Sequence, residues 1–141
     1  MAKRILIMGL SGSGKTTLAE KVVKVLSKRG KTVTWFNADT VREQHNDWDF
    51  SDAGRLRQAE RMGRFAANSM SDYVLTDFIA ALQEQRNIYA ADYTIWMDTI
   101  KSCKFEDTNQ AFENPYKYDM RITSWDDIDV EAIVDEIDGS V

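Results

Sequence analysis

The sequence holds few of the residues that mark disulfide-rich, linker-rich or membrane-spanning chains: among 141 residues there are one cysteine, one proline and seven glycines. The lone cysteine, Cys103, cannot form a disulfide within the chain, so we expect a reducing compartment, the cytoplasm. No run is apolar for long enough to cross a bilayer, so no membrane partner is expected. No low-complexity stretch accompanies the single proline, Pro115. We therefore expect one compact domain over residues 1–141.

Basic charge is also scarce. The chain has 18 Lys and Arg against 23 Asp and Glu, a formal net charge of -5. Domains that bind nucleic acid are usually basic, so a nucleic-acid partner is not expected, although a local basic pocket remains compatible with this balance. Hydrophobic residues make up 43% of the chain, which is enough to bury a core and argues against global disorder.

Apolar runs typical of buried parallel strands alternate with segments of helical periodicity. This alternation predicts an α/β protein with a five-stranded, mostly parallel sheet between two layers of helices. The segment 100–115 has no clear periodicity and is predicted to be a loop over the site. The expected strands are 3–8, 31–38, 72–79, 92–98 and 117–123, and the expected helices are 15–28, 40–45, 51–68, 81–90 and 125–137.

A phosphate-binding loop lies between the first predicted strand and helix. Residues 9–16, GLSGSGKT, match the pattern G-x-x-x-x-G-K-S/T in full. Glycines let the backbone approach phosphate oxygens, and the start of the following helix attracts negative charge. Lys15 is predicted to reach the β- and γ-phosphates of a nucleoside triphosphate, and Thr16 to bind Mg²⁺. The predicted nucleotide-binding residues are Gly9, Ser11, Gly12, Ser13, Gly14, Lys15, Thr16 and Thr17.

Two acidic residues follow predicted strands, and each has two interpretations. Asp77 ends YVLTD, residues 73–77, and either binds Mg²⁺ or caps the following helix. Asp39 follows the second strand at the sheet edge where α/β proteins bind ligands. It either contacts the metal and accepts a proton from an attacking hydroxyl, or caps the helix that carries Arg42. Arg42 in turn either holds an anionic acceptor or is a solvated charge.

The long predicted helix presents Arg57, Arg61 and Arg64 on one face. This face is either an anion cradle or a solvated face paired with Glu60 and Asp52.

Three aromatic residues, Trp48, Phe50 and Phe78, either stack on a nucleotide base or pack in the core.

Several of these spacings together resemble the adenylylsulfate kinase family. The loop GLSGSGKTTLA is similar to theirs, NADTVR to D-G-D-N-V-R, and FSDAGRLRQAERMG to F-S-x-x-D-R-x-x-N-I-R-R-x-G. FIAALQEQR resembles F-I-S-P-Y-R-x-x-R, and the segment around Pro115 and Tyr116 resembles the end of the family domain. The likeness covers most of residues 3–123. It implies a P-loop kinase fold and transfer of the ATP γ-phosphate to the 3′-hydroxyl of adenylylsulfate, as in sulfate assimilation.

The resemblance also implies roles for individual residues. Lys15 and Asp39 would be catalytic, and Thr16 and Asp39 would hold Mg²⁺; the predicted metal role of Asp77 rests on its place at the end of a strand and not on the resemblance. The implied acceptor site is an anionic-nucleotide site in which two aromatic residues sandwich the acceptor adenine and two arginines hold its phosphosulfate. Its residues are Asp39, Arg42, Phe50, Arg55, Gln58, Phe78 and Ile79. A homodimer is a further implication of the resemblance.

The chain departs from the family pattern at several places. Asn37 stands where the family has Asp, and Asp77 replaces a small polar residue. After the fourth strand, the basic lid segment of the family is shortened, and the arginine that packs on the ATP base has no counterpart other than Lys101 or Lys104. A short lid should exclude water less well.

These departures leave two alternatives open. One is a kinase of another nucleotide, nucleoside or nucleic-acid end, and the other is a degenerate ATP-binding regulator with little transferase activity. A GTPase switch is disfavoured because no N-K-x-D base-recognition motif is present.

Overall fold

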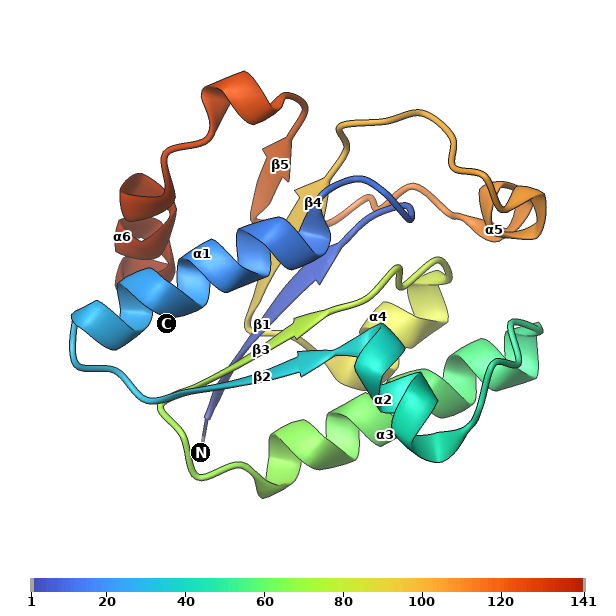
Figure 1. Ribbon diagram of the computed structural model, residues 1–141, viewed down its shortest axis with the longest axis horizontal. Coiled ribbons are helices and arrows are strands. Elements are labelled where there is room, and N and C mark those ends of the chain that lie inside the picture. Colours follow the sequence, from blue (N-terminus) through green and yellow to red (C-terminus); the bar gives the residue numbers. More distant parts are fainter. Residues whose placement is uncertain (1, 141) are drawn as a thin grey trace.

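The computed structural model describes residues 2–140, which form one sheet flanked by helices (Figure 1). The strands are β1 Lys3–Met8, β2 Val33–Asn37, β3 Tyr73–Asp77, β4 Tyr93–Met97 and β5 Met120–Ile122. The helices are α1 Lys15–Lys28, α2 Ala38–His45, α3 Asp52–Asn68, α4 Gln83–Tyr89, α5 Glu106–Ala111, the 3₁₀ helix η1 Trp125–Asp127 and α6 Val130–Ser140. Within residues 2–140, none of the helices combines the length and apolarity that crossing a bilayer requires.

The five strands are all parallel, in the order β2-β3-β1-β4-β5. Helices α1 and α6 cover one face of the sheet, and α2, α3 and α4 cover the other (Figure 1). The predicted three-layer α/β/α architecture is therefore confirmed. Because β1 is central, the loop after it lies between the carboxyl ends of β2 and β3 on one side and those of β4 and β5 on the other.

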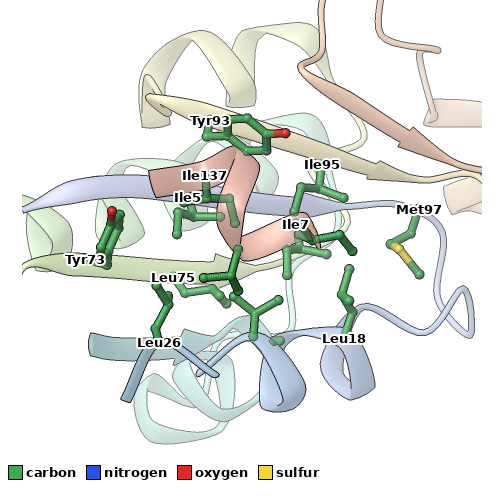
Figure 2. Packing of buried hydrophobic residues seen from close by; sticks show 14 of the residues in the cluster. Ile5, Ile7, Leu18, Leu26, Tyr73, Leu75, Tyr93, Ile95, Met97 and Ile137 are labelled. Carbon is green, nitrogen blue, oxygen red and sulfur yellow. The ribbon is translucent and has the colours of Figure 1, made fainter. Parts of the chain in front are cut away.

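The sheet divides the core into two clusters. On the α1 and α6 side, Ile5 and Ile7 of β1 pack with residues of both helices, including Leu18 and Ile137 (Figure 2). On the other side, alternate residues of the same strand pack against α3, with Met62 fully buried. This alternation follows from the pleat, which points successive side chains of a strand to opposite faces. Both faces of β1 are therefore apolar, as the continuous run in the sequence predicted.

The start of α3 is as predicted: Ser51 accepts a hydrogen bond from Gly54 N and caps the helix. The predicted closing helix over 125–137 is wrong at its beginning. Ser124 caps the short η1, Ile128 is extended, and the Asp129 carboxylate accepts a hydrogen bond from Ala132 N at the start of α6. Two successive caps therefore break the segment, and Trp125 lies in η1, outside α6.

The segment 100–115 is not a plain loop, because it contains α5. Its six residues form a helix after Phe105, and Asn109 fastens the preceding turn through two hydrogen bonds with the Cys103 backbone. Thr108 is the buried residue of this helix and hydrogen-bonds to Arg55 of α3. The segment does lie over the site, as predicted, since four of its residues line the cavity described below.

Candidate active site

The phosphate loop has the backbone that its glycines allow. Gly12 and Gly14 have φ of +87° and +101°, values that side chains with a Cβ rarely adopt. A Cβ on Gly9 would lie 2.8 Å from Ser13 Oγ, so the loop folds tightly over this position. Among the described residues no side chain caps α1 at Gly14. The first N–H groups of α1 are therefore available to an anion.

Lys15, the first residue of α1, bends back over the loop. Its Nζ donates a hydrogen bond of 2.9 Å to Leu10 O. Burial lowers the pKa of Lys15 to about 8, while attraction to Asp77 and Asp39 acts in the opposite direction. An anion bound in the loop would favour the charged form and restore a higher pKa. The position suits a cation that neutralises phosphate oxygens.

A polar cluster joins the ends of β2 and β3 to α1. The Asp77 carboxylate accepts hydrogen bonds from Trp35 Nε1 (2.7 Å), Thr16 Oγ1 (2.8 Å) and Asn37 Nδ2 (3.0 Å). Asn37 and Asp77 are paired in register on neighbouring strands. Burial raises the pKa of Asp77, whereas the three donors favour its charged form. Asp77 does not cap α4, which begins at Gln83, so the capping interpretation is wrong.

Asp39 lies in the first turn of α2 and faces the cavity. The residue that caps α2 is Asn37, whose Oδ1 accepts a hydrogen bond from Thr40 N. The interpretation of Asp39 as the helix cap is therefore wrong. Its exposed carboxylate is available to a metal ion or to a hydroxyl group.

Two arginines lie against one aromatic ring. The Cζ atoms of Arg42 and Arg55 lie 4.3 and 5.5 Å from the centroid of the Phe50 ring. Both arginines are buried, with exposed fractions of 4% and 2%. Burial lowers the pKa of Arg42, and repulsion from Arg55 and Arg61 adds to it. The carboxylate nearest to Arg55, that of Asp107, is 3.8 Å away. This is a strongly cationic pocket that suits a bound anion.

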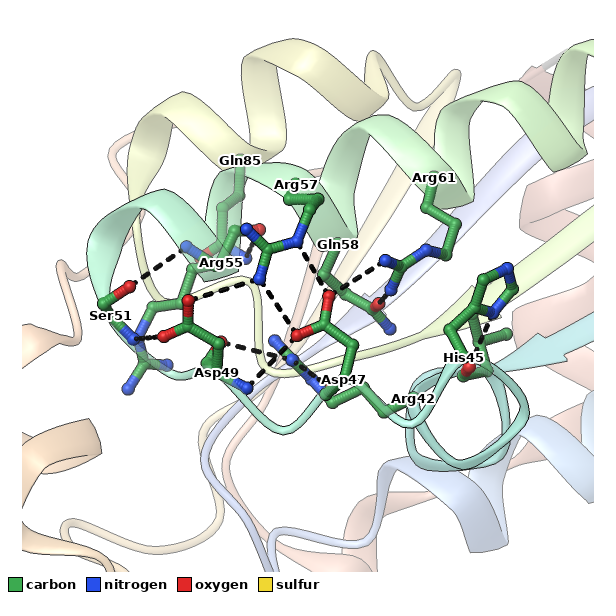
Figure 3. Close-up of polar contacts among 12 residues, drawn as sticks. Arg42, His45, Asp47, Asp49, Ser51, Arg55, Arg57, Gln58, Arg61 and Gln85 are labelled. Atoms are coloured by element: carbon green, nitrogen blue, oxygen red, sulfur yellow. Dashed lines mark hydrogen bonds and ion pairs between the residues drawn. The ribbon is translucent and has the colours of Figure 1, made fainter.

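The loop between α2 and α3, residues 46–51, is fastened by a network of ion pairs (Figure 3). Asp47 accepts two hydrogen bonds from Arg57 (2.8 and 3.0 Å) and one from Arg61 (2.9 Å). These arginines hold the pKa of Asp47 far below its usual range. Arg42 binds the same loop by donating hydrogen bonds to the carbonyl oxygens of Asp47 (2.9 Å) and Asp49 (3.3 Å). The network therefore fixes the loop that carries Phe50.

The face of α3 with Arg57 and Arg61 is ion-paired rather than an anion cradle. The partners differ from those predicted: they are Asp47 and Asp49 of the loop, not Glu60 and Asp52. The error arises because the sequence shows neighbours along a helix but not the loop folded against it.

One cavity of about 790 Å³ brings most of the predicted site residues together. Two residues of the phosphate loop, Gly9 and Ser13, are buried and do not line it. The predicted residues on its wall are Ser11, Gly12, Gly14, Lys15, Thr16, Thr17, Asp39, Arg42, Phe50, Arg55, Gln58, Asp77, Phe78 and Ile79.

Phe78 belongs to both the cavity wall and the core. It is 3% exposed and meets the Tyr89 ring edge-on at 5.9 Å. Trp48, which is half exposed, also lines the cavity. Phe78 therefore fits both predicted alternatives, because it packs in the core and also lines the cavity.

The cavity also has wall residues that the sequence did not single out, namely Gln85, Phe105, Asp107 and Thr108. Gln85 Nε2 donates a hydrogen bond of 3.0 Å to Arg55 O, which supports the arginine from α4. No periodicity or motif marks these residues. The two lysines considered for the lid lie in different places. Lys104 lines this cavity, whereas the Lys101 ammonium is 3.6 Å from the Asp98 carboxylate.

A family model described as adenylylsulphate kinase matches residues 1–122. The adenylyl-sulfate kinase of Bacillus pumilus (strain SAFR-032) is 39% identical over 87 residues, which are 60% of this chain and 44% of that protein. The adenylyl-sulfate kinase of Bacillus licheniformis is 37% identical over the same length. The chain thus matches less than half the length of these curated relatives.

Solved structures share the fold. The Mycobacterium tuberculosis APS kinase CysC, in complex with AMPPNP and APS, superposes with a TM-score of 0.76 over 98% of this chain and 96% of that one, at 22% identity. The shikimate kinase of Aquifex aeolicus vf5 superposes with a TM-score of 0.61 over 97% and 94%, at 17% identity. The fold is therefore that of P-loop kinases, and with the family model covering most of its length, the chain belongs to the adenylylsulphate kinase family.

Proposed function

We propose that this protein transfers the γ-phosphate of ATP to the 3′-hydroxyl of adenylylsulfate. The observation that carries the proposal is the make-up of the cavity described above, which has the phosphate loop on one wall and two buried arginines stacked on Phe50 on another. A phosphate loop alone indicates a nucleoside triphosphate. The paired arginines add a second, positively charged site, which suits an acceptor that is itself anionic.

The phosphate half of the cavity fits a triphosphate with its metal ion. The free N–H groups at the start of α1 and the Lys15 ammonium would bind the β- and γ-phosphates. The hydroxyl of Thr16 and the carboxylates of Asp77 and Asp39 are hard oxygen ligands of the kind that Mg²⁺ prefers, and would hold it directly or through water. When bound, Mg²⁺ would neutralise the charge that develops on the moving phosphoryl group.

The other half would position the acceptor. Arg42 and Arg55 would bind the phosphosulfate, and Phe50 and Phe78 would flank the adenine, with Gln58 and Ile79 completing the wall. Asp39 lines the same cavity and would orient the 3′-hydroxyl and accept its proton as the new oxygen–phosphorus bond forms and the bond from the γ-phosphorus to the bridging oxygen of the leaving ADP breaks. Phosphoryl transfer needs little more than this positioning and charge neutralisation.

The experiment is incubation of the purified protein with ATP, Mg²⁺ and adenylylsulfate, with ADP and the 3′-phosphorylated product quantified by chromatography. A Lys15→Met variant serves as control for contaminating kinases. The proposal requires equal amounts of both products. Formation of ADP without any phosphorylated acceptor would show that the protein hydrolyses ATP, and would contradict the proposed transfer. Neither product at high enzyme concentration, with ATP binding intact, would favour the non-catalytic regulator.

Other acceptors are separated in the same assay. Replacing adenylylsulfate by nucleosides, modified nucleotides or oligonucleotide 5′-ends should give no product if the arginine pocket is specific for a phosphosulfate. Product from one of these acceptors and not from adenylylsulfate would overturn the substrate assignment while leaving the kinase assignment intact.

We also propose a homodimer, on the family resemblance alone. A related structure is described as a hexameric APS kinase from Thiobacillus denitrificans, which this chain matches over 28% of its length. Light scattering of the purified chain measures its mass in solution, and a monomer at all concentrations would contradict the proposal.

A further inference from the structure

The place of the nucleotide base can be inferred from the strand order. Asp39 and Phe78 follow β2 and β3, so the acceptor half of the cavity lies on one side of the central strand β1 (Figure 1). A triphosphate held in the loop after β1, with its γ-phosphate toward Asp39, extends its α-phosphate and ribose away from that side. Its base is then directed toward the segments that follow β4 and β5.

One large aromatic side chain of those segments lies against the phosphate loop. Trp125, the first residue of η1 after β5, packs on the backbone of Gly14: a Cβ at Gly14 would overlap its ring and lie 2.8 Å from Nε1. The indole is nevertheless 39% exposed. Within residues 2–140 its Nε1 makes no hydrogen bond. A large apolar surface is thus left in water directly beside the loop.

The backbone around Trp125 is held in place on both sides. Ser124 Oγ accepts a hydrogen bond from Asp126 N, and Ile128 N donates one to Trp125 O. Arg121 of β5 is tied to the Asp98 carboxylate after β4 by a 2.6 Å contact. The ring therefore sits on an ordered turn rather than on a free loop.

The segment after β4 is tied to the same loop. Thr99 Oγ1 donates a hydrogen bond of 2.7 Å to Ser13 O, and Ile100 Cδ1 would lie 3.8 Å from a Cβ on Gly12. The phosphate loop thus contacts two apolar side chains, Ile100 from the segment after β4 and Trp125 from the segment after β5. Trp125 is the larger of the two and the one with an aromatic face.

We propose that Trp125 is the platform on which the adenine of ATP stacks, and so a positioning residue for the nucleotide. The inference rests on ATP binding from the proposed function, and it does not require the acceptor to be adenylylsulfate. Stacking a base on an aromatic ring is favourable in water and needs no hydrogen-bonding partner, which suits the partly exposed ring of Trp125. The contact with Gly14 places the ring where the ribose and base leave the phosphates.

The test compares a ligand that has a base with one that has none. Wild-type protein and the variants Trp125→Ala and Trp125→Phe are titrated calorimetrically with AMPPNP and with inorganic tripolyphosphate, both with Mg²⁺ and without acceptor. We expect Trp125→Ala to weaken AMPPNP binding about tenfold or more and to leave tripolyphosphate binding unchanged. Trp125→Phe should recover most of the AMPPNP affinity. Tyr116→Ala, which removes another exposed aromatic ring, is the matched control.

Other outcomes overturn the inference. An equal loss for both ligands would mean that Trp125 only shapes the phosphate loop. No loss for either would mean that the base lies elsewhere. Retained tripolyphosphate binding by Trp125→Ala also shows that the variant is folded. Because no acceptor is present, the result is independent of whether adenylylsulfate is the substrate.

Discussion

The pair formed by Asn37 and Asp77 yields the most detailed prediction. Asn37 Nδ2 donates to Asp77 Oδ2 at 3.0 Å, while Asn37 Oδ1 caps α2. The amide cannot flip without losing the cap, so its orientation is fixed. Asn37→Asp keeps the cap but sets two carboxylate oxygens against each other. We expect a loss of about 2 to 3 kcal/mol of unfolding free energy at neutral pH, from one hydrogen bond and the repulsion that replaces it.

In the converse change, Asp77→Asn, an amide whose oxygen accepts from Trp35 Nε1 turns its NH₂ group toward the NH₂ group of Asn37 and removes the acceptor of Thr16. We expect a loss of about 1 to 2 kcal/mol, because the cost of unsatisfied donors is partly offset by the removal of a buried charge. The double variant restores the pair in reverse: the amide at position 77 donates to the carboxylate at position 37, which still caps α2. The double variant should lie within about 1 kcal/mol of wild type, a coupling of about 2 kcal/mol.

Urea unfolding of all four proteins without nucleotide measures this cycle. Effects that simply add would refute the argument, since they would show that the two side chains do not depend on each other. The pH dependence gives a second check. In Asn37→Asp, repulsion between the two neighbouring carboxylates raises the pKa of one of them in the folded state. The stability of the variant is therefore retained at acid pH and lost as pH rises through that pKa. The deficit of this variant should therefore be smaller near pH 4 than at pH 7.

Three further predictions concern the site. Gly54→Ala places a methyl group against the Asp49 backbone and should displace the loop 46–51 and raise the KM for the acceptor. As the control, Gly63→Ala adds a methyl group with nothing closer than 3.8 Å and should stabilise α3 by up to about 1 kcal/mol in thermal unfolding. Arg55→Lys should raise the KM for the acceptor at least about tenfold and leave that for ATP unchanged in steady-state kinetics, because an ammonium cannot reproduce the guanidinium contacts. ATP affinity by calorimetry should fall as pH rises past about 8, where unliganded Lys15 loses its proton; a constant affinity would contradict this lowered pKa.

The sequence predicted the sheet, the phosphate loop and most of the cavity wall, because each depends on local signals. Continuous apolar runs mark the strands, and the parallel arrangement brings their carboxyl ends to one edge, so Asp39, Asp77 and Phe78 had to lie near Lys15. The α3 start was predictable from Ser51, whose side chain acts within one turn of the helix.

What the sequence missed depends on contacts between distant segments. Asp47 is a loop residue in the sequence, and only the folding of the loop onto α3 gives it two arginine partners. Two closely spaced caps broke the predicted helix 125–137, and the contact of Trp125 with the phosphate loop depends on this break. Asp39 was a candidate cap because it precedes the predicted helix 40–45, whereas the helix begins at Ala38 and Asn37 caps it.

The division of the core by the sheet has a consequence for how such a protein can diverge. The phosphate loop leads into α1, which packs in one hydrophobic cluster, whereas α2 and α3, which carry Arg42 and Arg55, pack in the other. The two clusters share no residue. Changes accumulated beneath α3 can therefore reshape the wall that faces the acceptor without repacking the support of the phosphate loop. A duplicated gene could thus exchange one substrate for another through one layer of the molecule while the other layer stays under its original selection.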